Sequence, residues 1–292
     1  KMKVVGKSVE KIDSLSLSTG CAKFYDDYNF PNEGYVKFLY SPHAHAKILS
    51  IDVSKAKSLE GVIDILHYGN VPRILHTTAG QGYPEPSPYD AVMFDSTMRF
   101  VGDRVAAVFA ETPEIAEEAI SKIQVDYKLL PAIFDFEKAM EKNAPIIHPE
   151  NDKKYPIPAY YEPKRNIAAK VEINVGNLEK GLEESDFTFD ETFYTHYGSH
   201  AMIEPHGVVT YLDENNRLTI ITATQVPFHV RRICAHVLQI PIKRIHVIKP
   251  RIGGGFGGKQ EVIHKMSKIR SKLHQSQETK HTVVESVVVE DA

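Results

Sequence analysis

The sequence predicts an α+β fold in two regions. In the first region, stretches with the two-residue period of a strand alternate with stretches that have the 3.6-residue period of a helix. In the second region, β-branched and aromatic residues alternate with polar ones over several stretches, which indicates sheet. The length of 292 residues is long for one domain and suits two, each with its own core.

Four strands are predicted in the first region. The stretches 36–40, 46–53 and 62–66 are short, apolar and rich in β-branched or aromatic residues, and 124–130 alternates in the same way. The Gly- and Pro-rich stretch 79–90 interrupts them and is predicted to be a surface loop. Together these stretches predict a compact domain.

One helix of the first region is predicted over 113–123. Thr112 can cap its N-terminus, Pro113 suits the first helical position, and Glu114 lies at the positive end of the helix dipole. Its apolar residues form one stripe, which consists of Ile115, Ala116, Ala119, Ile120 and Ile123. The stripe predicts that this face of the helix is buried.

Prolines mark the boundary between the two regions. Five of them lie between Pro145 and Pro163 in a segment with little periodicity, so we place the boundary at roughly 145–165. The elements predicted beyond it are strands at 169–175, 187–197, 207–212, 218–224 and 244–249, a short helix at 177–184, and a helix that begins at Pro227. A hairpin turn is predicted at 213–217, where Asn can adopt a positive φ.

Composition excludes several classes of protein. Lys and Arg number 35 against 38 Asp and Glu, a net charge of −3 with mixed signs along the chain, so we expect no nucleic-acid or membrane partner. No run of 18 apolar residues occurs, and the first residues lack the apolar core of a signal peptide. Cys21 and Cys234 are too few and too distant for a disulfide framework or a paired-cysteine metal site. We therefore expect a soluble, cytoplasmic protein.

A glycine-rich loop is the strongest local signal. Between Ile252 and Lys259 there are five glycines in six positions, directly after a predicted strand. Glycine permits positive φ and lets backbone N–H groups approach a bulky anionic ligand, although loop tips of this composition also occur without any ligand. Gly253, Gly255 and Gly258 match G-x-G-x-x-G, but only 34 residues follow, too few for the βαβ repeats of a dinucleotide-binding domain.

Short motifs follow one another in a specific order along most of the chain. They are GKSV at 6–9, TG at 19–20, SPHAHA at 41–46, ID at 51–52, FVGD at 100–103, VDY at 125–127, EPH at 204–206, TQ at 224–225 and the loop at 253–259. In this order the chain resembles the molybdenum-binding large subunit of the xanthine dehydrogenase and aldehyde oxidoreductase family. The resemblance implies an α/β hammerhead domain at 1–145 (core about 20–130), a linker at 146–165, a partial molybdopterin-binding α+β domain at 166–261 and an atypical tail at 262–292.

The resemblance implies a cofactor site in the second region. In this family a molybdenum centre on a pterin dithiolene hydroxylates carbon atoms next to nitrogen or oxygen, with water as the oxygen source. By resemblance Gln225 donates its side-chain amide to an oxo ligand of the metal, and Phe256 lies in the loop whose backbone passes beside the metal. Gly254, Gly255 and Gly257 then let that backbone approach. A neutral amide stabilises oxo charge without competing as a metal ligand.

Gln260 departs from the family pattern. Purine-oxidising members of the family place a Glu at the matching position, where it contacts the heterocycle. A neutral amide can orient a ring by donating and accepting hydrogen bonds, but it lacks the charge of a carboxylate. We expect Gln260 to face a small-molecule substrate, which is a purine, a related N-heterocycle or an aldehyde, and we do not assign xanthine itself.

The resemblance also implies further cofactors and partners. It implies a molybdenum–molybdopterin cofactor, in the plain or the cytosine dinucleotide form, with iron–sulfur and FAD centres on partner subunits. It ends near Glu261, and the family's general base, a glutamate far downstream, has no counterpart here, so no catalytic residue is assigned. We expect a truncated or frameshifted relative, or one piece of a split subunit, that is inactive alone and contacts a completing chain or copies of itself.

Two alternatives stay open. One is a non-catalytic remnant that keeps the hammerhead domain as an interaction module. The other is a zinc hydrolase, because His and carboxylate side chains are zinc ligands. The candidate zinc ligands are the group His196, His200, Glu204 and His206, and His43 with His45 is a separate candidate metal site. Against zinc, Gly198 and Pro205 interrupt any helix that would align the group of four.

Overall fold

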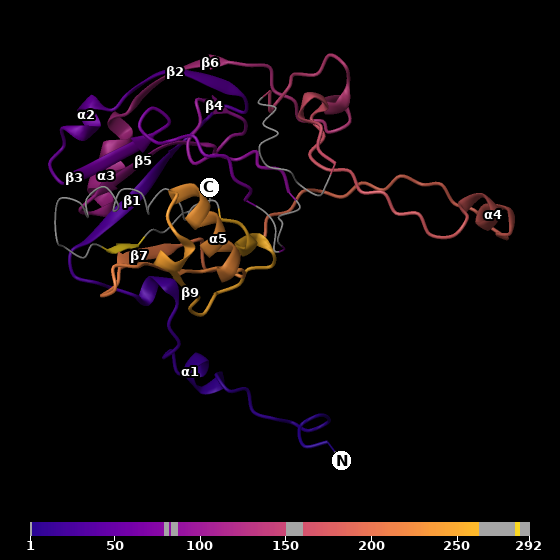
Figure 1. Ribbon diagram of the computed structural model, residues 1–292, viewed down its shortest axis with the longest axis horizontal. Helices are drawn as coiled ribbons and strands as arrows, with labels where there is room; N and C mark the ends of the chain where they lie inside the picture. Colours follow the sequence, from indigo (N-terminus) through magenta and orange to yellow (C-terminus); the bar gives the residue numbers. More distant parts are fainter. Residues whose placement is uncertain (1, 79–81, 83–86, 150–159, 263–283, 287–292) are drawn as a thin grey trace.

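The computed structural model describes residues 2–78, 82, 87–149, 160–262 and 284–286. Its body contains three sheets, and two segments project from it (Figure 1). One is the N-terminal segment with helix α1 (Ser14–Ser18), and the other carries helix α4 (Leu178–Glu183) at its far end. No helix among the described residues is long and apolar enough to cross a membrane. The mixture of helix and sheet confirms the predicted α+β class.

The largest sheet has four strands in the order β10-β1-β5-β3, with bounds β1 Glu33–Tyr40, β3 Val62–His67, β5 Arg104–Ala110 and β10 Val284–Ser286. β5 pairs antiparallel with both β1 and β3, and β10 runs parallel to β1. All seven residues of β5 are buried, because alternate side chains enter two different cores. A central strand buried on both faces reads as one continuous apolar run, which explains the sequence VAAVFA.

Helix α3 (Pro113–Lys122) covers one face of this sheet, and its predicted features are confirmed. The hydroxyl of Thr112 accepts a hydrogen bond from the N–H of Ile115 at 3.3 Å and so caps the helix. The apolar stripe packs on Ile65, Val108 and Ala110, together with the short helix α2 (Ser54–Lys57). A second sheet, in the order β4-β2-β6, comprises β4 Thr97–Met98, β2 Ala46–Asp52 and β6 Gln124–Leu129.

The second region folds into a three-stranded sheet covered by one helix. The strands are β7 Val208–Leu212, β8 Leu218–Thr222 and β9 Ile245–Ile248, and the helix α5 spans Pro227–Leu238. β7 and β8 form the predicted hairpin, and Asn216 in its turn has a φ of 55°. β9 is parallel to β8, and α5 is the crossover between them.

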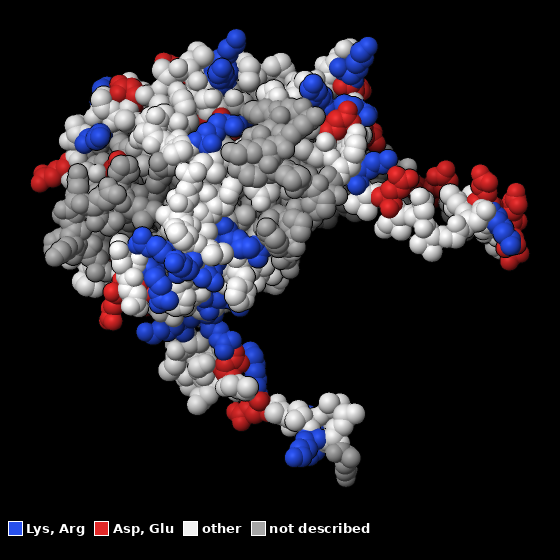
Figure 2. Space-filling view, in the orientation of Figure 1, with Lys and Arg blue, Asp and Glu red and all other residues white. Residues whose placement is uncertain are grey.

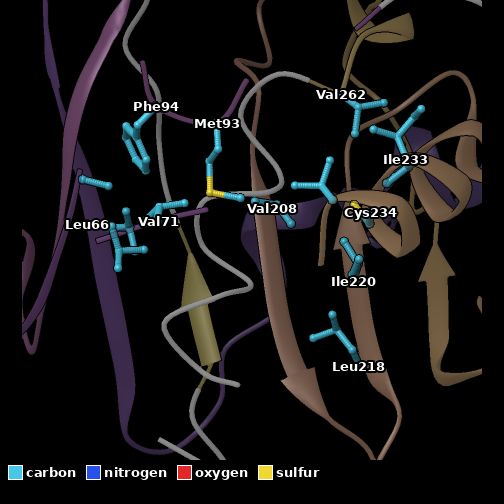
Figure 3. Packing of buried hydrophobic residues seen from close by; sticks show 14 of the residues in the cluster. Leu66, Val71, Met93, Phe94, Val208, Leu218, Ile220, Ile233, Cys234 and Val262 are labelled. Atoms are coloured by element: carbon cyan, nitrogen blue, oxygen red, sulfur yellow. The ribbon is translucent and has the colours of Figure 1, made fainter. Parts of the chain in front are cut away.

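The two regions share one hydrophobic core. Val208, Ile220 and Ile233 of the second region belong to the same buried cluster as Leu66 and Met93 of the first (Figure 3). The remaining short elements are the 3₁₀ turns η1 (Tyr25–Asp27), η2 (Lys138–Met140), η3 (Pro163–Arg165), η4 (Ile242–Arg244) and η5 (Gly258–Gln260). The shared core fixes the second sheet against the first region.

The strands predicted at 169–175 and 187–197 are wrong. The structure leaves both stretches extended but outside any sheet, and their side chains are exposed. The alternation in the sequence is present, but an extended segment becomes a strand only when its backbone pairs with another. The helix predicted between them is confirmed as α4, which Asn177 caps by accepting a hydrogen bond from the N–H of Lys180.

Candidate functional site

The glycine loop leaves β9 and closes on itself through left-handed backbone. Gly254, Phe256 and Gly257 have φ angles of 98°, 49° and 94°, values that side-chain-bearing residues rarely adopt. Phe256 is the one residue of these three that is not glycine, and it is 73% exposed. A large aromatic residue held in this strained conformation, with its ring in solvent, sits on the rim of the loop. The positive φ angles explain why glycine occupies positions 254 and 257.

Close packing accounts for three more glycines. A Cβ atom on Gly253 would lie 2.5 Å from the Cβ of Glu204, and one on Gly255 would lie 2.7 Å from Oε1 of Gln225. A Cβ on Gly258 would lie 2.9 Å from Cε of Met202. Each distance is below a van der Waals contact, so the loop packs directly against two other segments of the chain.

Gln225 holds the loop from its inner side. It follows β8, and its backbone N–H donates to the carbonyl of Lys259 at 2.9 Å. Its Oε1 accepts hydrogen bonds from the N–H groups of Gly257 at 3.1 Å and Lys259 at 3.3 Å. With the carbonyl oxygen engaged in this way, the amide nitrogen keeps its two N–H groups as donors. The neighbouring Thr224 also donates through its hydroxyl to the carbonyl of Lys259, at 3.3 Å.

A buried ion pair joins the two ends of the loop. Oε2 of Glu204 accepts hydrogen bonds from the N–H of Gly253 at 2.7 Å and from Nζ of Lys259 at 2.6 Å. The side chain of Lys259 is 0% exposed and that of Glu204 11%. In the sequence, Glu204 and Lys259 lie in family motifs and Glu204 is a candidate zinc ligand, but the pairing of the two side chains was not predicted. The available signal was an isolated Lys at the end of a glycine run, together with a carboxylate 55 residues earlier.

Three consecutive N–H groups of the loop point to what it can bind. Among the described residues, the N–H groups of Gly254, Gly255 and Phe256 have no hydrogen-bond partner. Consecutive backbone N–H groups in a loop with alternating left-handed residues form a concave anion site. Gln225, whose side chain contacts Gly255, has an amide nitrogen that is a further neutral donor. The predicted residues Gln225, Gly254, Gly255, Phe256 and Gly257 are therefore brought together.

Gln260 and Glu261 follow the glycine loop, and Glu261 lies near His200. Gln260 lies in η5, is half-buried, and its backbone N–H donates to the carbonyl of Gly257 at 3.3 Å. Burial raises the pKa of the Glu261 carboxyl, and the charge of His200 opposes that rise. Gln260 thus lies next to the predicted cofactor residues, at the point where the chain leaves the loop.

The candidate metal ligands do not converge. His43 packs its ring edge-on against Tyr127, with centroids 4.9 Å apart, and Nδ1 of His45 lies 2.6 Å from the carbonyl oxygen of Pro131. His196 and His200 are exposed. Within the described part of the chain, no three His, Cys, Asp or Glu side chains are grouped as metal ligands would be.

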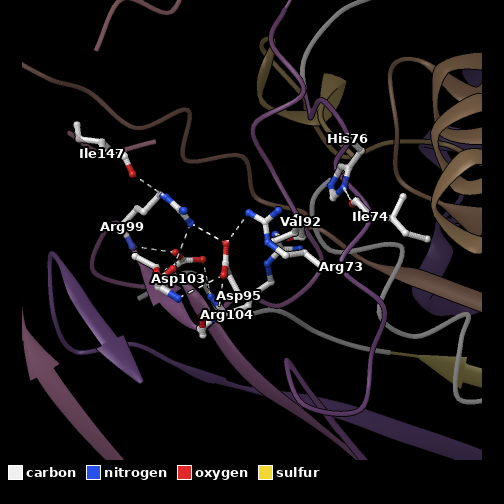
Figure 4. A network of polar contacts seen from close by, with 11 residues as sticks. Arg73, Ile74, His76, Val92, Asp95, Arg99, Asp103, Arg104 and Ile147 are labelled. Carbon is white, nitrogen blue, oxygen red and sulfur yellow. Dashed lines mark hydrogen bonds and ion pairs between the residues drawn. The ribbon is translucent and has the colours of Figure 1, made fainter. Parts of the chain in front are cut away.

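A second polar cluster lies in the first region (Figure 4). Arg99 donates through Nη1 to Asp95 at 2.9 Å and through Nε to the carbonyl of Ile147 at 3.0 Å. Burial would raise the pKa of Asp95, but the hydrogen bond and charge of Arg99, with the charge of Arg73, hold it below its usual value. Burial raises the pKa of the neighbouring Asp103. This network ties the segment around Ile147 to the first region.

Two family models match the chain. The a/b hammerhead domain of aldehyde oxidase and xanthine dehydrogenase matches residues 19–131, and the molybdopterin cofactor-binding domain matches residues 160–269. The chain belongs to the aldehyde oxidase and xanthine dehydrogenase family. The predicted family and its two named folds are confirmed, and the second match extends past Glu261, where the sequence resemblance was expected to end.

Similar proteins cover nearly all of this chain, but the chain covers only part of them. The probable hypoxanthine oxidase XdhD of Escherichia coli K12 is 36% identical over 90% of this chain and 30% of its own length. The nicotinate dehydrogenase large molybdopterin subunit of Eubacterium barkeri is 32% identical over 89% of this chain and 56% of its own length. The structure of quinoline 2-oxidoreductase from Pseudomonas putida 86 matches with a TM-score of 0.74 and 28% identity, over 100% of this chain and 35% of that one. Reconstituted CO dehydrogenase from Oligotropha carboxidovorans gives a TM-score of 0.79 and 26% identity, over 98% and 35%.

Proposed function

We propose that this chain forms the hammerhead region and the metal-facing loop of a molybdenum hydroxylase. The observation that carries the proposal is the position of Gln225. Its carbonyl oxygen accepts hydrogen bonds from two N–H groups of the glycine loop, so its amide nitrogen keeps its N–H groups as donors for a ligand. The chain spans about a third of XdhD and about half of the nicotinate dehydrogenase subunit, so the activity belongs to a larger assembly.

The residues present fit a molybdopterin cofactor. The donors at the loop are neutral amides, from the backbone at 254–256 and from the side chain of Gln225. Neutral donors stabilise anionic ligand atoms without entering the metal's own coordination sphere. Gly255 lies so close to Gln225 that a Cβ would fill the space between the side chain and the loop. The backbone at Gly255 therefore lies closer to Gln225 than a residue with a side chain could.

The protein's part in the reaction is to bind and orient. When bound, a molybdenum–molybdopterin cofactor, in the plain or cytosine dinucleotide form, supplies the redox and oxygen-transfer chemistry. Gln225 and the loop N–H groups would hold the cofactor, and Phe256 on the loop rim would cover one side of it. Gln260 orients the substrate through its amide, which donates and accepts without charge.

The substrate class follows from Gln260 and from the relatives. XdhD is named for hypoxanthine, and other similar proteins are named for nicotinate and quinoline. These are nitrogen heterocycles, and a neutral amide at position 260 suits a neutral ring nitrogen or carbonyl. We propose an N-heterocycle, with aldehydes as the second class. Iron–sulfur and FAD centres on partner subunits would accept the electrons.

The test is the metal content of the chain isolated from its native host with its natural partners. Molybdenum is expected to co-purify with the wild-type chain, and Gln225→Ala is expected to lower molybdenum per chain by roughly 10-fold to 100-fold, as loss of an outer-shell ligand contact does. Gln124→Ala, at an exposed position on β6, is the matched control and leaves the molybdenum content unchanged. A chain without molybdenum contradicts the proposal and favours a non-catalytic interaction module. One zinc per chain would support a zinc hydrolase instead.

A further inference from the structure

The N-terminal segment is attached to the chain directly before the glycine loop. We call residues 11–27 the N-terminal clip, which joins the projecting N-terminus to the body (Figure 1). The guanidinium of Arg251 forms an ion pair with the carboxylate of Asp13, and the backbone N–H of Arg251 donates to the carbonyl of Lys23 at 3.2 Å. Ile252 and the glycines of the loop follow Arg251. The clip therefore holds the chain at two points just where it enters the loop.

The clip is itself anchored on the sheet of the second region. Tyr25 in η1 is buried, and a Cβ atom on Gly207 would overlap its ring. Directly after the clip, Phe30 packs its ring against Tyr211 of β7, with centroids 4.9 Å apart. These contacts lie on one face of the sheet, whereas α5 covers the other. Because the clip has this fixed base, it can impose a position on Arg251.

The charge around the clip favours the ion pair. Lys and Arg side chains gather where the N-terminal segment leaves the body (Figure 2). Nζ of Lys11 also lies 3.4 Å from Oδ1 of Asp13. Partial burial would raise the pKa of Asp13, but the hydrogen bond from Lys11 and the charge of Arg251 hold it below its usual value. Asp13 is therefore a carboxylate in neutral solution, and its partner is always charged.

The two ends of the loop are held in different ways. Glu204 and Lys259 form a buried pair at the far end, with side chains 11% and 0% exposed. Asp13 and Arg251, at the near end, are 15% and 44% exposed. The N–H groups of residues 254–256 lie between these ends. A concave anion site needs its N–H groups to converge, so its shape depends on how the chain enters and leaves it.

We propose that Asp13 is a positioning residue for the glycine loop. Through Arg251 it sets the direction in which the chain enters the loop, and it thereby keeps the N–H groups of residues 254–256 convergent on an anionic ligand. Loss of the ion pair lets the loop open locally while the sheets stay folded. The positioning is independent of the proposed function, whereas its consequence for a molybdopterin cofactor rests on that function.

The test is amide hydrogen exchange of the full chain, followed by mass spectrometry on peptides that cover the clip, residues 252–260 and the buried strand β5. Asp13→Asn removes one charge with little change in size. It is expected to raise the exchange rate of the hydrogen-bonded amides in 252–260 by about 5-fold, as loss of a partly exposed ion pair does, and to leave β5 unchanged. Asp26→Asn is the matched control, because Asp26 is an exposed carboxylate in η1 of the same clip, and it is expected to leave the loop unchanged.

A double-mutant cycle tests whether Asp13 acts through Arg251. Arg251→Gln is expected to raise loop exchange by about the same factor as Asp13→Asn, and the double variant is expected to raise it no further, because one interaction is lost in each case. A residue that only attaches the N-terminus would change exchange in the clip and not in the loop. Faster exchange confined to the clip, or effects of the two substitutions that multiply, therefore overturns the proposal.

Molybdenum release from the assembly isolated from its native host separates this inference from the proposed function. Release is expected to be about 5-fold faster for Asp13→Asn than for the wild type or Asp26→Asn, because it passes through the open loop. A wild-type assembly without molybdenum contradicts only the proposed function, since exchange in the loop still decides the positioning role. Faster loop exchange with an unchanged release rate contradicts the contact between loop and cofactor. An unchanged loop in a molybdenum-containing assembly contradicts only the role of Asp13.

Discussion

Replacement of Lys259 by Met removes one partner of the buried ion pair that joins the ends of the glycine loop. The side chain of Lys259 is 0% exposed, and its Nζ lies 2.6 Å from Oε2 of Glu204. Oε1 of Glu204 is buried and has no hydrogen-bond partner in the described structure. After the substitution, only the N–H of Gly253 would remain to stabilise a buried carboxylate. Met has nearly the same length as the Lys stem, so packing changes little.

The expected loss in the free energy of unfolding is about 3–5 kcal/mol, the usual cost when one partner of a buried pair is removed and the other stays charged. An exposed pair of similar geometry provides the scale for comparison. Nζ of Lys37 lies 2.7 Å from Oε2 of Glu117, but these side chains are 35% and 72% exposed. Lys37→Met is therefore expected to cost about 0–1 kcal/mol, because solvent already screens that pair.

The assay is urea unfolding of the full chain, followed by far-UV circular dichroism and by tyrosine fluorescence, since the chain has 14 Tyr and no Trp. A double-mutant cycle with Glu204→Gln isolates the pair. With both charges removed, Lys259→Met is expected to cost at least about 1 kcal/mol less than it does beside the wild-type Glu204. The reasoning is refuted if Lys259→Met costs no more than Lys37→Met, or if the two substitutions in the cycle are additive.

Three further predictions concern pH, backbone geometry and substrate choice. Burial lowers the pKa of His76 to about 3, so on acidification the unfolded chain binds a proton near pH 6.5 and the folded chain does not. The free energy of unfolding therefore falls as the pH drops below 6.5, by about 2 kcal/mol at pH 5. Urea titrations should show that His76→Gln loses less free energy of unfolding than the wild type over this range. Gly257→Ala, at a φ of 94°, is expected to lower the free energy of unfolding by about 1–2 kcal/mol. Gly181→Ala, in open space on α4, is expected to raise it by roughly 0.5–1 kcal/mol. Equal effects of the two substitutions would contradict the assigned backbone geometry. Gln260→Glu in the assembled enzyme is expected to change the ratio of kcat/KM for purines to that for aldehydes by about 10-fold or more, and an unchanged ratio would remove Gln260 from the substrate site.

Local signals in the sequence were sufficient for much of the fold. The helix over 113–123 could be predicted because its cap, its first proline and its apolar stripe all lie within a dozen residues. The hairpin turn at 213–217 could be predicted because Asn tolerates the positive φ that the turn requires. The order of short motifs identified the family, because order and spacing are properties of the sequence itself.

Pairing of strands was the main failure. The stretches 169–175 and 187–197 have the alternation of strands, and the structure leaves them unpaired on the surface. A two-residue period reports which side chains share a face, but it contains no information about whether a second backbone is present.

The sequence by itself determined the fold class, the glycine loop and the assignment of Gln225 beside it. Only the tertiary structure decided that Oε1 of Gln225 faces the loop, which leaves the amide nitrogen as the donor, and that Glu204 and Lys259 form one buried pair. Those contacts join residues that lie 32 and 55 positions apart. Contacts at that separation depend on how the sheet and the loop pack, and no local period or propensity in a single sequence records that packing.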